Sequence, residues 1–163
     1  MLIKQIALKN FRQYKDLQVV EFSCDKEKNV TVILGDNTSG KTTLIQAFNW
    51  CLYGTTSFKT RELINSETLQ EMSMFSSAEV SVEVELRHED KLYVIRRTQV
   101  VTKNEGNKPS CTRATLKVEY KEKSGEMQEV PVFECQNTIN KILPEALSGY
   151  FFFDGEHVSE INS

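Results

Sequence analysis

Residues 30–54 read VTVILGDNTSGKTTLIQAFNWCLYG, and this stretch decides the fold of the 163-residue chain. It opens with a short apolar run, rich in β-branched side chains, that is typical of a buried strand. Residues 35–42, GDNTSGKT, then match the pattern G-x-x-x-x-G-K-[ST] at every fixed position. After Lys41 the apolar residues recur at helical spacing, and Gly54 ends the pattern. A strand, a glycine loop and an amphipathic helix in this order predict a phosphate-binding loop in an α/β fold.

The residue types in the loop suit the phosphates of a nucleotide. Gly35 and Gly40 let the backbone turn tightly, so that successive N–H groups point inward, and the helix that follows adds the positive end of its dipole. Lys41 is the natural contact of the β- and γ-phosphates, and the Thr42 hydroxyl is the natural ligand of Mg²⁺. We therefore expect ATP and Mg²⁺ as cofactors. The expected cofactor contacts within the loop are Asn37, Thr38, Ser39, Gly40, Lys41, Thr42 and Thr43.

The remainder of the chain reads mostly as strands. Residues 78–86 alternate strictly between apolar and polar side chains, which is the period of a strand with one buried face. We expect a mixed sheet that carries the strand 30–34 and the helix 41–53, with an antiparallel layer from residues 2–22 and 78–120. Further expected elements are strands at 2–8, 17–22, 92–101, 115–120 and 150–153, a short helix within 55–76, and a helix at 136–147.

The composition is that of a globular chain, with 39% hydrophobic and 26% charged residues and a net charge of −3. No apolar run approaches the ~20 residues that cross a bilayer, and the N-terminus lacks a signal-peptide pattern, so we expect a cytoplasmic protein with no membrane partner. The four cysteines are widely scattered, which predicts reduced thiols, several of them buried, and no structural zinc site. An acidic stretch at 62–90 precedes a basic stretch at 91–123. Either adjacent strands pair these charges across a solvated face, or the basic stretch faces a polyanion.

Three segments resemble the SMC and RecF group of ATP-binding-cassette (ABC) ATPases. Residues 6–14, IALKNFRQY, are similar to the opening strand and turn of that group, and residues 35–54 are similar to the start of SMC-like head domains. Residues 150–156, YFFFDGE, most resemble the DndD family, the ATPases of bacterial DNA phosphorothioation systems. The resemblance implies a P-loop ATPase head that a long coiled coil splits in two, with residues 1–163 as its N-terminal lobe.

The resemblance also implies partners and further site residues. The C-terminal lobe would supply the signature motif, the Walker B acids and a switch histidine, and ATP would join two heads in a homodimer that works on DNA or with a DNA-acting complex. Asp154 lies where many SMC relatives carry the Q-loop glutamine, so it is expected as a catalytic and metal contact beside Lys41 and Thr42. Arg12, in the N-F-R turn, is expected near the phosphates or the adenine, with a plain surface arginine as the alternative. Residues 146–150, ALSGY, and 151–154, FFFD, superficially match a signature motif and a Walker B strand, and we interpret both as decoys.

Three other functions compete with an ATP-gated DNA-maintenance machine. A self-sufficient phosphotransferase, such as a small-molecule kinase, needs lid arginines that no run in the sequence offers. A GTPase switch would use an N-K-x-D motif, but residues 107–110 read NKPS, and Ser110 lacks the carboxylate that selects guanine. The N-F-R-x-Y start argues against a transporter's nucleotide-binding domain. We therefore expect an ATPase that is active when complete, with residues 1–163 alone catalytically silent.

Overall fold

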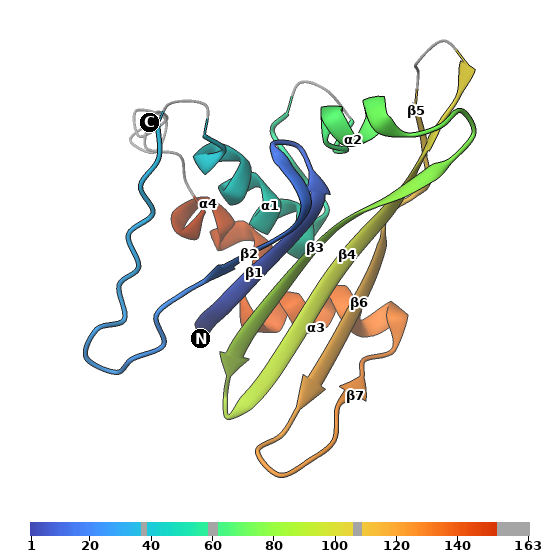
Figure 1. Ribbon diagram of the computed structural model, residues 1–163. Helices are drawn as coiled ribbons and strands as arrows, with labels where there is room; N and C mark the ends of the chain where they lie inside the picture. The colour runs from blue at the N-terminus through green and yellow to red at the C-terminus, as the bar shows by residue number, and fades with distance from the viewer. Residues whose placement is uncertain (37–38, 59–61, 106–108, 153–163) are drawn as a thin grey trace.

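The computed structural model describes residues 1–36, 39–58, 62–105 and 109–152, and Figure 1 shows a long, twisted sheet with helices packed against one face. The sheet has the order β2-β1-β3-β4-β6-β7, with β5 pairing with β4 off this path. Its strands are β1 (Leu2–Phe11), β2 (Tyr14–Glu21), β3 (Ser77–His88), β4 (Lys91–Lys103), β5 (Pro109–Cys111), β6 (Thr115–Lys121) and β7 (Gln128–Glu129). The helices are α1 (Lys41–Tyr53), α2 (Ser66–Glu71), α3 (Cys135–Ile142) and α4 (Ser148–Phe151), with the short 3₁₀ turns η2 (Val132–Glu134) and η3 (Glu145–Leu147).

Strand β3 confirms the alternation that its sequence predicts. One face of the strand is almost fully buried, because α1 packs against β3 and β4. The buried side chains on this face are Val80, Val82, Val84 and Leu86. An antiparallel sheet commonly buries one face and leaves the other in water, which is the arrangement here.

The other face of the sheet carries ion pairs between neighbouring strands. Arg96 on β4 lies opposite Glu83 on β3, and its guanidinium is 2.7 Å from the carboxylate. Lys4 on β1 pairs in the same way with Glu85 on β3. The Arg96–Glu83 pair joins the basic and acidic stretches across this solvated face, as the first of the two interpretations predicts, whereas Lys4 lies outside both stretches.

Helix α1 also forms where the sequence predicts it. Gly54 ends the helix in the left-handed region, with φ 76°, and its N–H donates to the Trp50 carbonyl at 2.9 Å. Arg97 on β4 is buried and donates from Nε to the Cys51 carbonyl at 3.1 Å, so a positive charge complements this end of the helix. The aromatic side chains of Phe48, Trp50 and Tyr53 are buried in the core.

The strand predicted at residues 30–34 is not formed. The side chains of Val30, Val32 and Leu34 are 77%, 74% and 88% exposed, and the segment runs as an extended coil away from the sheet (Figure 1). A strand needs a neighbour to pair its N–H and C=O groups, and within the described residues this segment has none, whatever its β propensity. All strand pairs in the described part of the chain are antiparallel, so the expected mixed sheet is not formed there either.

The C-terminal predictions are also corrected. The expected helix 136–147 ends at Ile142, because Pro144 disfavours helical dihedrals at Leu143, which has φ −144°. The strand predicted at 150–153 is instead the short helix α4 as far as Phe151, and Phe153 lies outside the described residues. Phe152 stacks on Phe48 with ring centroids 5.0 Å apart, so packing against α1 outweighs the strand preference of the aromatic run.

Two cysteines are buried, as predicted. Cys51 and Cys135 lie in the core, whereas Cys24 and Cys111 are exposed. Burial raises the pKa of the Cys51 thiol to about 12, so this side chain stays protonated and behaves as a small apolar group. Among the residues described, no helix combines the length and the apolar character that crossing a membrane would require.

Candidate nucleotide-binding site

Gly40 sets the geometry of the phosphate loop at the start of α1. It is the N-cap of the helix and has φ 99°, in the left-handed region where a side chain is strained. Its carbonyl accepts the first helical hydrogen bond, from the Leu44 N–H at 2.9 Å. Gly35 is constrained in another way, since a Cβ there would collide with the Ser39 side chain. The backbone therefore requires glycine at position 40, whereas a side chain at position 35 would force Ser39 to move.

The Lys41 ammonium lies over the loop. Its Nζ donates to the carbonyls of Gly35 at 2.6 Å and Asp36 at 2.7 Å. The Ser39 N–H also donates to the Asp36 carbonyl, at 3.1 Å, which closes the turn. A phosphate is a stronger partner for an ammonium group than neutral carbonyls are, so this position suits a cation that a nucleotide can recruit.

The threonines after Lys41 face in different directions. Thr42 is exposed in the first turn of α1, where it can reach a ligand at the end of the helix. Thr43 is only 3% exposed and donates from Oγ1 to the Gln13 side chain, so its hydroxyl faces the β1–β2 turn. Of the other expected site residues, Asn37, Thr38 and Asp154 lie outside the described part of the chain.

The β1–β2 turn lies directly beside the loop. The Tyr14 hydroxyl donates to the Gly40 carbonyl at 3.1 Å, next to the contact between Gln13 and Thr43. Arg12 of the same turn points elsewhere: its Nη1 donates to the Glu62 carbonyl at 3.1 Å, and its guanidinium lies 4.6 Å from the centre of the Phe58 ring. The structure thus brings the turn to the loop through Gln13 and Tyr14, which the sequence did not single out.

Asn65 fixes the turn from the other side. Its side chain donates to the Arg12 carbonyl, and its Oδ1 accepts from the Thr68 N–H at 3.0 Å, which caps α2. The Asn65 N–H donates to the Asn10 carbonyl at 2.8 Å. The cap pattern N-S-E-T is visible in the sequence, but its contact with a turn more than fifty residues away is not. A depression of about 380 Å³ opens here, lined by Arg12, Gln13, Ile64, Asn65, Ser66 and Glu67.

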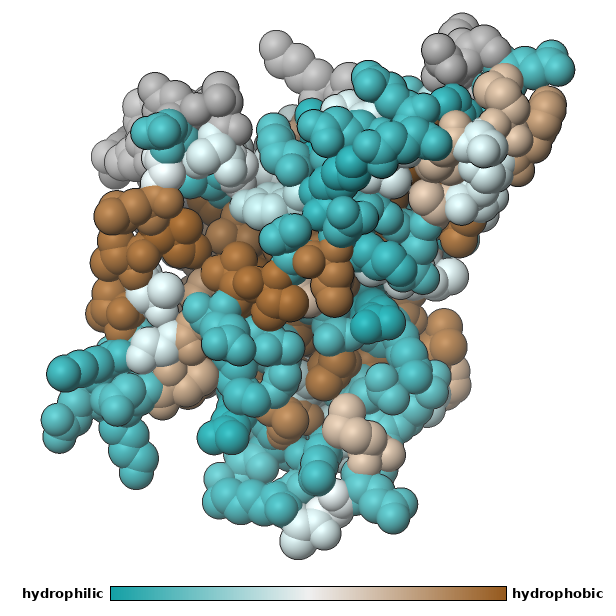
Figure 2. All heavy atoms as spheres, viewed as in Figure 1, coloured by the Kyte–Doolittle hydropathy of each residue, from teal (hydrophilic) through white to brown (hydrophobic). Residues whose placement is uncertain are grey.

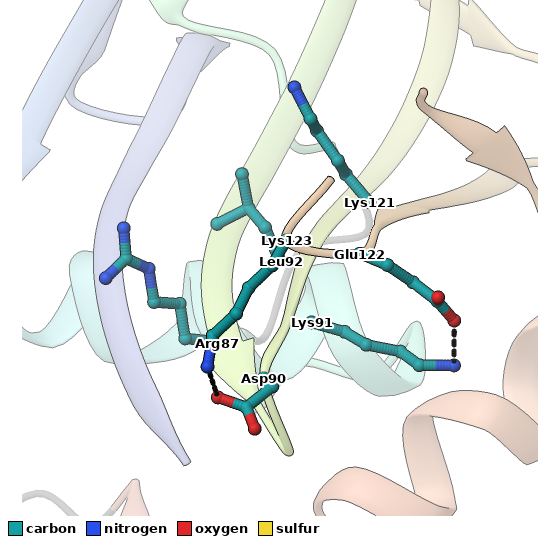
Figure 3. A pocket seen from close by; sticks show the side chains of 7 residues that line it. All are labelled: Arg87, Asp90, Lys91, Leu92, Lys121, Glu122 and Lys123. Carbon is teal, nitrogen blue, oxygen red and sulfur yellow. Dashed lines mark ion pairs between the residues drawn. The ribbon is translucent and has the colours of Figure 1, made fainter. Parts of the chain in front are cut away.

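A second depression, of about 360 Å³, lies at the opposite end of the sheet, where the β3–β4 turn approaches the end of β6 (Figure 3). Several charged side chains that line this depression already form ion pairs with one another. Lys91 pairs with Glu122 at 3.1 Å, and Lys123 pairs with Asp90 at 2.7 Å. Of these two depressions, the one at the β1–β2 turn is connected to the phosphate-loop helix through the contact between Gln13 and Thr43, so we assign it to the candidate site.

The sequence is similar to parts of RecF and Rad50 proteins. The DNA replication and repair protein RecF of Acetivibrio thermocellus is 34% identical over 112 residues, which are 66% of this chain and 29% of that protein. RecF of Clostridium kluyveri is 40% identical over 67 residues, 40% of this chain and 17% of that protein. The DNA double-strand break repair Rad50 ATPase of Thermoplasma acidophilum is 26% identical over 156 residues, 96% of this chain and 16% of that protein. The chain thus spans less than a third of the length of each of these relatives.

These relatives support the expected likeness to RecF-like ATPase heads. The model of the AAA domain family matches residues 5–156, a span that holds the phosphate loop, the β1–β2 turn and α2 together. The chain therefore belongs to the AAA domain family.

Proposed function

We propose that this chain is the ATP-binding, N-terminal lobe of an SMC- or RecF-like ATPase head that serves DNA maintenance. The observation that carries the proposal is the loop at the N-terminus of α1. There, a glycine at φ 99° begins the helix, and the Lys41 ammonium is held over the loop by two backbone carbonyls. A helix N-terminus with a glycine-rich loop is a general site for phosphate groups.

The triphosphate would lie across residues 37–43. In this proposal Lys41 contacts the terminal phosphates, while Asn37, Thr38, Ser39 and Gly40 contribute loop contacts. Thr42 would hold Mg²⁺, whose charge offsets that of the β- and γ-phosphates. Thr43 would contribute its backbone N–H, because its hydroxyl is engaged by Gln13.

The nucleoside would extend toward the depression beside the β1–β2 turn. That depression adjoins the loop through Gln13, which contacts Thr43 in α1 and also lines the depression. Arg12 lines it as well, which supports a role near the adenine. Asp154, by its place in the sequence, would assist Mg²⁺ or the attacking water in the complete head.

The exposure of segment 30–34 supports the proposal that further strands complete the ATPase head. Figure 2 shows apolar surface along this segment, where Val30, Val32 and Leu34 are largely exposed. Contiguous apolar surface of this kind usually marks an interface. We propose that a C-terminal lobe covers it and supplies the missing catalytic residues, and that ATP then joins two such heads. Residues 150–156 favour the DndD family of phosphorothioation ATPases among heads of this type.

A link to DNA rests on the relatives. RecF is named for DNA replication and repair, and Rad50 for double-strand break repair, which supports a function in DNA repair for this chain too. DNA modification or restriction is proposed instead from the resemblance of residues 150–156 to the DndD family. A self-sufficient phosphotransferase remains the competing function, and its distinguishing property is turnover without a second lobe.

Residues 1–163 should bind Mg²⁺–ATP but hydrolyse it at a rate near background. Hydrolysis needs a carboxylate that orients water and donors across the γ-phosphate, and the loop supplies only part of this set. A phosphate-release assay on the purified chain, with and without the C-terminal lobe of the same head, tests this. Activity that returns only on addition of the lobe supports the split head. Turnover by the chain alone at ordinary enzyme rates, abolished by Glu156→Gln, would establish the phosphotransferase instead.

A further inference from the structure

We propose that Tyr14 is a positioning residue for the phosphate loop: its hydroxyl and ring fix the peptide between Gly40 and Lys41 so that the Lys41 N–H faces the bound phosphates. The inference rests on the proposed nucleotide site. It assigns a task to the first residue of β2, which need not touch the nucleotide itself.

Two contacts join Tyr14 to Gly40. The hydroxyl donates to the Gly40 carbonyl at 3.1 Å. The ring covers the open side of the glycine, because a Cβ on Gly40 would lie 3.3 Å from the Tyr14 oxygen and 3.4 Å from Cζ. Tyr14 thus both holds the carbonyl and fills the space that a side chain on Gly40 would take.

Because the peptide bond is planar, the contact with the Gly40 carbonyl also sets the direction of the Lys41 N–H. In a trans peptide the C=O of one residue and the N–H of the next point in opposite directions. The Gly40 carbonyl accepts from two donors, the Tyr14 hydroxyl and the Leu44 N–H, which occupy both of its acceptor directions. With the carbonyl held on that side, the Lys41 N–H is held on the other, at the open end of α1 where an anion binds.

Hydrogen bonds anchor the β1–β2 turn that precedes Tyr14. Gln13 is bonded to the buried Thr43 of α1, and Asn65 is bonded to the Arg12 carbonyl, so the residues before Tyr14 are anchored on two sides. Partial burial also raises the pKa of the Tyr14 hydroxyl above its usual value, so this group remains a donor through the neutral range. The hydroxyl is therefore in place before any ligand arrives.

Helix α1 offers a matched control at its other end. Tyr53, in the last turn, donates from its hydroxyl to the Leu143 carbonyl, also at 3.1 Å. Tyr14→Phe and Tyr53→Phe each remove one hydroxyl oxygen and one tyrosine-to-carbonyl hydrogen bond, at opposite ends of α1. Only Tyr14→Phe releases a peptide of the phosphate loop.

The test is calorimetric titration of the purified chain and both variants with Mg²⁺–ATP and Mg²⁺–ADP, alongside thermal unfolding. Both variants should unfold at slightly lower temperatures than the wild type. Tyr14→Phe should raise the Kd of both nucleotides by about threefold to tenfold, which corresponds to the usual contribution of one hydrogen bond. Tyr53→Phe should leave both affinities unchanged.

The outcomes separate this inference from the proposed function. If the wild type binds nucleotide and Tyr14→Phe binds it as tightly as Tyr53→Phe does, Tyr14 is only structural and the inference is wrong. If both variants lose affinity in proportion to their loss of stability, the same conclusion follows. If the wild type binds neither nucleotide, the proposed function is wrong, and the inference fails with it.

Discussion

Lys41→Ala should weaken the binding of Mg²⁺–ATP by about 2–3 kcal/mol, which is roughly a 30- to 150-fold rise in Kd. The lysine is the charged donor of the loop, and alanine removes its contact with the terminal phosphates. In the structure the ammonium bonds only to carbonyls of the loop itself, those of Gly35 and Asp36, as far as the described contacts show. The free energy of unfolding should therefore change little, and the loss should appear in affinity.

Calorimetric titration of wild type and variant measures this effect. Lys121→Ala is the matched control, because Lys121 is an exposed lysine that lines the depression at the far end of the sheet (Figure 3). The affinity of the Lys121→Ala variant for Mg²⁺–ATP should equal that of the wild type. ADP should bind the wild type nearly as well as ATP or somewhat more weakly. Equal affinities for Lys41→Ala and the wild type would remove the loop from nucleotide binding.

Phe11→Ala should lower the free energy of unfolding by about 3–5 kcal/mol, the usual loss when a buried phenylalanine is truncated. Phe11 is 0% exposed and lies where the β1–β2 turn meets α1. Its ring centroid is 5.4 Å from that of Trp50 and 6.4 Å from that of Phe58, so alanine leaves a cavity between the sheet and the helix. Because small domains are stable by only about 5–15 kcal/mol, the variant should be close to unfolding.

Urea denaturation followed by tryptophan fluorescence suits this measurement, since Trp50 is the one tryptophan of the chain and lies beside Phe11. Phe133→Ala provides the control: Phe133 is 81% exposed, and its truncation should change the stability by less than about 0.5 kcal/mol. Similar small losses in both variants would contradict the packing of the turn against α1.

The elements that the sequence predicts correctly are those whose signals are local. Helix α1 follows from a glycine loop, a 3.6-residue apolar period and Gly54, all within residues 35–54. Strand β3 follows from a strict two-residue alternation that only a half-buried strand requires. The glycines and Lys41 of the loop follow from the chemistry of phosphate binding, which fixes residue types at fixed spacing.

The errors come from structure that depends on distant neighbours. Residues 30–34 have the composition of a buried strand, but a strand also needs partners, and the described residues supply none. The aromatic run that starts at Tyr150 favours a strand by propensity, but Phe152 packs on Phe48 from the end of a short helix. Local preference does not decide either case, because tertiary contacts outweigh it.

The same reason explains the site residues that the sequence did not reveal. Gln13, Tyr14 and Asn65 acquire their positions through hydrogen bonds that span 26 to 53 residues of sequence. The N-F-R-x-Y segment resembles the SMC and RecF group, and that resemblance predicts Arg12 near the nucleotide. In the structure the two residues after Arg12 are the ones that contact the phosphate-loop helix.

The binding of a nucleotide at the N-terminus of α1 is tested most directly by mapping amide chemical shifts of the ¹⁵N-labelled chain during titration with Mg²⁺–ATP. The amides of residues 39–44 and of Gln13 and Tyr14 should shift with a common Kd. Those of residues 87–92 and 121–123, around the depression at the far end of the sheet, should stay in place. Shifts confined to that far end, or no saturable shift anywhere in the spectrum, would contradict the phosphate loop as the site of binding.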